Sequence, residues 1–168
     1  LQAARGTTSH FNFSSWANAG VIGLMGLMIV VNTAAVAYAA VKFWRSEPAV
    51  AAPYLWGIRL GLLIFLLAGL EGFVMIRLHA HSVGVADGGP GLPLLNWSTR
   101  GGDLRVAHFV GLHALQVLPL VGHLFSSPRL AGRVGNPTYW VWAAGAAYGG
   151  ASLLLFLLAL AGLPLIPR

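Results

Sequence analysis

Cysteine is absent from this sequence, and acidic residues are scarce. The 168-residue chain has no Cys and only four Asp and Glu residues, against ten Lys and Arg. Without thiols it can form no disulfide, thiolate metal site, iron–sulfur cluster or covalent c-type haem. Charged residues make up 8% of the chain, whereas a soluble domain carries roughly 25%. The composition therefore excludes a protein whose whole surface faces water.

Long apolar runs make up most of the chain. Hydrophobic residues account for 57% of the sequence, and apolar stretches of this length are typical of membrane spans. Proline, glycine and capping signals separate four predicted helices, at about 20–43, 53–79, 104–125 and 138–163. The sequence therefore predicts an all-α membrane protein: a single domain, 1–168, that forms a bundle of about four transmembrane helices.

The connecting segments indicate how this bundle is oriented. The turns after the first and third predicted spans are the more basic, so the positive-inside rule places them in the cytoplasm. Their basic residues are Lys42, Arg45, Arg129 and Arg133. The long Gly- and Pro-rich loop at 80–103 then faces outward. Because the positive charges are spread over short loops, the net charge of +6 indicates topology and not nucleic-acid binding.

Small residues form faces on the first and fourth predicted spans. Membrane helices approach each other closely where their side chains are small. We therefore expect these two faces to bind other membrane subunits. The residues concerned are Gly20, Gly23, Gly26, Gly145 and Gly149.

Polar side chains concentrate on the third predicted span. At the helical period its polar residues share one side, which we expect to face the other helices. They are Arg105, His108, His113, Gln116 and His123. Arg105 and Gln116, together with Asn32 of the first span, are predicted to belong to a polar core. Asp103 is the predicted N-cap of the third span. Asp87 and Asp103 could pair with Arg100 or Arg105 at this end of the bundle.

Glu71 lies well inside the second predicted span. At the helical rise it is about 12 Å below His79, and His113 is about 7–8 Å below His108 on the next span. The two helices run in opposite directions, so Glu71 and His113 should lie at similar depth. We therefore predict that these two side chains form a hydrogen-bonded pair.

Three functions are open for these polar side chains. In the first they only satisfy one another and fix the register of the helices. In the second they hold haem b or a metal ion, because imidazoles on facing helices can bind iron axially and His and Glu can bind metals. In the third they relay protons at a quinone, proton or lipid-substrate site. The candidate cofactor-binding residues are His79, His108, His113 and Glu71, and the candidate metal ligands are His79, His81 and His108.

One segment resembles a known family. The stretch HSVGVADGGPGLPLLNWSTRGGDLRVAHFVGLHALQVLPLVGHLF at 81–125 resembles a family of small, uncharacterised bacterial polytopic inner-membrane proteins, and SHFN at 9–12 is similar to the pattern of that family. The resemblance implies a bacterial inner membrane location, with the loop 80–103 in the periplasm. It also implies further helices upstream, and since this chain does not begin with Met we expect such helices to be missing. No functional residue is carried over.

Catalytic motifs are missing from the sequence, and the cytoplasmic loops are very short. These features favour a non-catalytic integral membrane subunit or scaffold of a larger energy-transducing complex, respiratory or photosynthetic. Its expected partners are the lipid bilayer and other membrane subunits. The alternatives are a small redox protein that binds haem or a metal through the second and third spans, and a quinone-binding or proton-relay protein.

Overall fold

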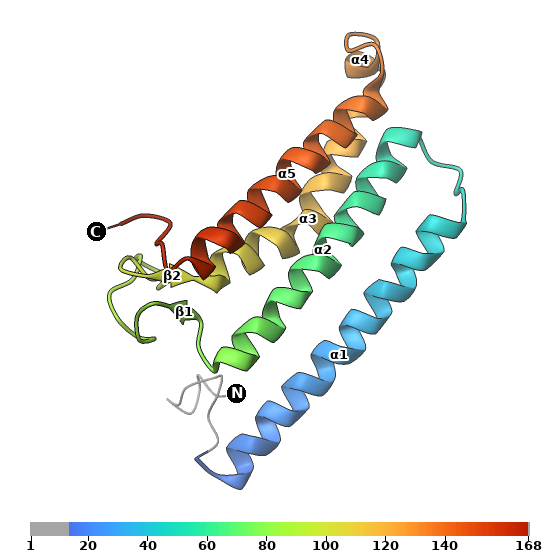
Figure 1. Cartoon of the computed structure of the whole chain (residues 1–168). Helices are drawn as coiled ribbons and strands as arrows, with labels where there is room; N and C mark the ends of the chain where they lie inside the picture. The colour runs from blue at the N-terminus through green and yellow to red at the C-terminus, as the bar shows by residue number, and fades with distance from the viewer. Residues whose placement is uncertain (1–13, 168) are drawn as a thin grey trace. The chain divides into compact units, whose positions relative to one another are not determined.

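The helices of the computed structural model coincide with the four predicted spans (Figure 1). The structure describes residues 14–167, so the SHFN motif at 9–12 lies outside the described residues. Four helices are long and apolar enough to cross a membrane: α1 (Trp16–Arg45), α2 (Ala52–Leu78), α3 (Leu104–Phe125) and α5 (Pro137–Leu160). The shorter elements are α4 (Pro128–Ala131), β1 (Ser82–Val83) and β2 (Gly102–Asp103). The prediction of an all-α membrane protein with four spans is confirmed.

The chain divides into two compact units, Leu1–Tyr38 and Ala39–Arg168. Most of α1 belongs to the first unit, and α2, α3 and α5 belong to the second. The first unit carries four residues predicted to pack or to join a polar core: Gly20, Gly23, Gly26 and Asn32. Their roles toward other helices stay predictions.

Helices α2 and α3 pack closely because glycines lie at their contact. The Gly57-x-x-x-Gly61 spacing puts two glycines on one face of α2. A Cβ atom added at Gly57 would collide with the carbonyl oxygen of Leu118, and one at Gly61 would lie 2.8 Å from the carbonyl oxygen of Ala114. Two glycines of α3 are enclosed by α2 in the same way, Gly111 and Gly122. A larger side chain at any of these positions would force the helices apart.

Helix α5 packs against both α2 and α3. The hydroxyl group of Tyr148 donates a hydrogen bond to the carbonyl oxygen of Val110, at 2.6 Å. A Cβ atom at Gly145 would lie 2.7 Å from Cδ1 of Leu60, and Gly149 faces α2 one turn further on. Both glycines therefore contact a helix of their own chain, whereas the sequence suggested that they bind other subunits. Gly145 and Gly149 pack against α2 within the unit, so this face of α5 is already covered.

A short antiparallel ladder joins the ends of α2 and α3. Ser82 of β1 pairs with Asp103 of β2, and Val83 pairs with Gly102. A Cβ atom at Gly102 would collide with the carbonyl oxygen of Ala159, near the end of α5. The base of the loop is thereby fixed against the helices that it connects. This holds Asp87, Asp103 and Arg105 in defined positions.

Candidate functional site

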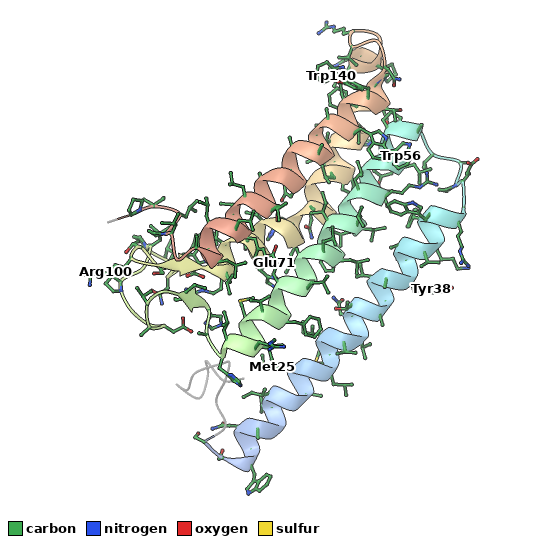
Figure 2. All side chains as sticks on the ribbon, in the orientation of Figure 1. Met25, Tyr38, Trp56, Glu71, Arg100 and Trp140 are labelled. Atoms are coloured by element: carbon green, nitrogen blue, oxygen red, sulfur yellow. The ribbon has the colours of Figure 1, made fainter. Side chains whose placement is uncertain are left out.

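The polar residues of α3 do not share a buried side. The face of α3 that contacts α2 and α5 is apolar and small, and includes Ala107, Ala114 and Leu118, which are fully buried. Figure 2 shows the side chains of this unit. Three polar residues of α3 are exposed on its surface: His113, Gln116 and His123. The other two, Arg105 and His108, are half-buried. Two helices that approach each other this closely leave little room for large polar side chains between them. The predicted inward polar face, with Gln116 in a polar core, is therefore replaced by an outward one.

His108 joins α3 to α2. Its ring Nδ1 lies 2.9 Å from the carbonyl oxygen of Ala68, which can only accept, so Nδ1 carries the proton and donates. Gly72, one turn along α2, leaves room for the ring, because a Cβ atom there would already lie 3.6 Å from Cε1 of His108. Nδ1 is occupied by this hydrogen bond, and Nε2 is the ring nitrogen that remains for a further contact. His108 thus serves as a cross-link between the helices, with one nitrogen still able to accept a hydrogen bond or bind a metal.

Glu71 is buried on α2, where Figure 2 labels it, with 9% of its surface exposed. Its Oε2 atom has no hydrogen-bond partner in the part of the chain that the structure describes. The predicted partner, His113, is exposed on α3, and its ring Nδ1 donates to the carbonyl oxygen of Phe109 at 2.6 Å. The structure therefore does not bring Glu71 and His113 together as the predicted pair. Depth along the helices was a poor guide here, because the two side chains point in different directions around their helix axes.

The predicted metal ligands are also dispersed. His79 is the C-cap of α2, with left-handed backbone angles and an exposed side chain. His81 pairs with Asp87, and His108 binds α2 as described above. Within residues 14–167, no three His, Asp or Glu side chains are grouped so that they could hold a metal ion. The described geometry therefore does not gather the predicted metal ligands His79, His81 and His108 into one site.

Asp103 and Arg105 form a polar cluster at the start of α3. Asp103 is 2% exposed, and its Oδ1 atom accepts hydrogen bonds from the backbone N–H and from Nε of Arg105, at 3.0 and 2.9 Å. Its Oδ2 atom accepts from Nη2 of Arg105 at 2.6 Å and from the backbone N–H of Ser98 at 2.8 Å. The predicted N-cap is confirmed. Of the pairings that the sequence left open for Asp87 and Asp103, the structure shows the one between Asp103 and Arg105. The cluster ties the loop to the first turn of α3.

Asp87 fastens the other half of the loop. Its carboxylate accepts hydrogen bonds from the backbone N–H groups of Ser82 and His81, at 2.7 and 2.9 Å, and lies 3.1 Å from the ring Nδ1 of His81. Burial raises the pKa of Asp87. The hydrogen bonds from His81 and Ser82 and the charge of His81 outweigh it, and they hold this pKa below its usual value of 3.8.

Acid is expected to release this turn. Because the pKa of Asp87 is lower in the folded than in the unfolded chain, its stabilising effect is present above the unfolded pKa and lost as the pH falls through the folded one. We expect the amide resonances of His81 and Ser82 to titrate with a midpoint below 3.8, measured by NMR in detergent micelles. The Asp87→Asn variant should show no such titration. A midpoint at 3.8 or higher in the wild type would contradict the prediction.

Sequence reasoning missed the glycines at the α2–α3 contact. Their signal was present, since Gly57 and Gly61 have the small-x-x-x-small spacing of close membrane helix pairs. It also missed the backbone contacts of Asp87, for which the Asp-Gly turn signal predicts a turn but no partners. Comparison of the chain with models of protein families, with curated proteins and with solved structures finds no match in any of the three.

Proposed function

We propose that this chain is a non-catalytic subunit of a membrane complex and binds a further transmembrane helix through the exposed side of α3. We place it in the bacterial inner membrane, with the loop 80–103 in the periplasm. The proposal is carried by one observation: Gln116 is exposed at mid-helix on the surface of the second unit.

The position of Gln116 makes its exposure costly in a membrane. It lies about 18 Å along α3 from Leu104 and about 14 Å from Phe125 at the helical rise, so it falls near the middle of the hydrocarbon layer. Among the described residues of the second unit, 39–167, its amide group has no hydrogen-bond partner. A primary amide has two donors and one acceptor group, and lipid chains satisfy none of them. A neighbouring helix with a polar side chain at this depth would satisfy the amide and bind α3.

The other polar side chains support a structural role for the chain. Asp103 and Asp87 each fasten one half of the loop, and His108 joins α2 to α3. These groups are occupied by contacts that hold the fold together, which is what a scaffold requires. On the outward side of α3, the amide of Gln116 is the group near mid-helix whose hydrogen-bonding capacity these contacts leave unused.

Association with a partner tests the proposal. Extracted in a mild detergent, the chain is expected to migrate as part of a larger complex in native electrophoresis. Replacing Gln116 by Leu should weaken that association by about threefold to twentyfold, the range measured for hydrogen bonds between membrane helices. As a matched control, Leu157→Ala alters an exposed apolar position on α5 and should leave the complex intact.

Two outcomes would contradict the proposal. A wild-type chain that extracts only as a monomer would exclude a stable complex, and a Gln116→Leu chain that assembles normally would exclude this side of α3. A monomer would direct attention to the alternative proton-relay or quinone function, for which the buried and unpartnered Oε2 atom of Glu71 is the specific observation.

A further inference from the structure

The loop between β1 and β2 contains a closed segment, residues 90–99, which we call the Leu94 loop. Gly91 and Ser98 form a β-bridge across its base. The backbone N–H and the hydroxyl group of Thr99 both donate to the carbonyl oxygen of Pro90, at 3.1 and 3.2 Å. The two ends of the Leu94 loop are therefore held together, and the segment between them projects as a unit.

The Leu94 loop is attached to the first turns of α3. Nη2 of Arg105 donates to the carbonyl oxygen of Asn96 at 2.6 Å. The ring of Trp97 meets the ring of Phe109 edge to face, with 5.6 Å between centroids, and Phe109 is exposed on α3. The loop is thus held beside the end of a membrane-spanning helix, and its position is set by contacts and not by chain length alone.

The tip of the Leu94 loop presents apolar side chains away from the protein. Leu94 is fully exposed and Leu95 is about half exposed. Leu94 has φ +67° and Asn96 has φ +51°, a left-handed conformation that costs free energy for residues other than glycine. The loop's hydrogen bonds hold this conformation, and the result is a leucine kept out of the core. A leucine that is both strained and fully exposed is favourable only if its side chain meets an apolar environment outside the chain.

The backbone of the tip suits a medium of low polarity. The N–H groups of Leu92, Leu95 and Asn96 all donate to carbonyl oxygens within the Leu94 loop, at 2.8 Å each, and Pro93 has no N–H group. Residues 88–99 contain no charged side chain. Among the described residues, the N–H group of Leu94 and the carbonyl groups of Leu94 and Leu95 make no such hydrogen bond, so the tip suits the headgroup boundary, where water and phosphates can satisfy them, and not the hydrocarbon layer.

The flanking residues match the same location. Trp97 is of the kind that concentrates at the membrane–water boundary, and the exposed Arg100, labelled in Figure 2, follows the loop directly. Arg side chains can pair with lipid phosphates while their neighbours contact acyl chains. We infer that the Leu94 loop inserts its Pro93–Leu95 tip into the headgroup boundary of the bilayer. This goes beyond the proposed function, since it concerns the lipid and not the subunit partner.

The absence of Cys allows a direct test. Leu94→Cys creates a single labelling site for an environment-sensitive fluorophore such as NBD, and it should not disturb folding because the side chain is fully exposed. In phosphatidylcholine–phosphatidylglycerol vesicles we expect a shift of the emission to shorter wavelength, quenching by lipids spin-labelled near the headgroup, and protection from aqueous iodide. Leu95→Cys should give a smaller shift. Ala86→Cys, on the exposed Asp87 turn, is the control and should be quenched by iodide.

Three results would overturn the inference. Iodide quenching at position 94 equal to that at position 86 would place the tip in water. Equal quenching of both positions by the lipid label would show no specific insertion of the tip. Shielding of position 94 from both quenchers would assign the tip to a protein partner, and it would leave the proposed role of Gln116 standing.

Discussion

Replacing Asp103 by Ala is expected to lower the free energy of unfolding of the second unit by about 3 kcal/mol. The carboxylate is almost fully buried and accepts from Ser98 and three times from Arg105. Its loss removes the N-cap of α3 and leaves Arg105 with its charge unpaired. The side chain of Arg105 is about one third exposed, so water can solvate part of its unpaired charge. The expected loss of stability is therefore at the low end of the range for a broken buried ion pair. Thermal unfolding in detergent, followed by circular dichroism, measures the change.

Asp103→Asn separates the two contributions. Asn is a good N-cap residue and its side-chain oxygen can still accept the backbone N–H of Arg105, but the charge is lost. We expect a loss smaller than that of the Ala variant. If Asn is as damaging as Ala, the charge pairing with Arg105 carries the effect and the cap contributes little. If the Ala variant unfolds at the temperature of the wild type, the loop and the start of α3 are not coupled through Asp103.

Replacing Gly57 by Ala is expected to cost about 2–3 kcal/mol, as overpacking of a close contact does. The added Cβ atom would collide with the carbonyl oxygen of Leu118, which belongs to the backbone and cannot turn aside as a flexible side chain could. Either α2 and α3 must separate or the backbone of α3 at Leu118 must shift. Gly61→Ala should act in the same direction, with its Cβ atom 2.8 Å from the carbonyl oxygen of Ala114. The readout is the unfolding temperature in detergent.

Gly69→Ala is the matched control on the same helix. A Cβ atom at Gly69 would meet no atom within 4 Å in the described chain. Since Ala has the higher helix propensity, this variant should be neutral or stabilising by up to about 1 kcal/mol. Equal losses at Gly57 and Gly69 would show that the α2–α3 contact is looser than described, and that glycine at these positions has no packing role.

The helices and their ends were accessible from the sequence because their causes are local. Four apolar runs of membrane length predicted four spans, and the structure places α3 at the predicted residues, 104–125. The N-cap role of Asp103 followed from a short polar side chain just before an apolar run. The sequence left open whether Asp103 pairs with Arg100 or Arg105, and the pair that forms is with Arg105, two residues away. Interactions of this kind lie within one turn of chain and need no knowledge of the rest of the fold.

The direction in which each polar side chain points was decided by the tertiary structure. Helical periodicity groups Gln116 and His108 on one side of α3, but only the close approach of α2 determines which side is buried. Because Gly57 and Gly61 bring α2 against Leu118 and Ala114, the space between the helices admits small residues and the polar ones are turned outward or to the edge. Contacts between residues that are far apart in sequence made that choice.

Glu71 and the Leu94 loop illustrate the same division. The sequence determined that Glu71 lies within a membrane span and that residues 80–103 form a long loop of low charge. The burial of the Oε2 atom of Glu71 without a partner, and the exposure of Leu94 in a left-handed conformation, depend on three packed helices and on hydrogen bonds across the loop. Hydrophobic content and capping act through neighbouring residues, so the sequence displays them directly. Burial and exposure depend on which surfaces meet, so only the folded chain displays those.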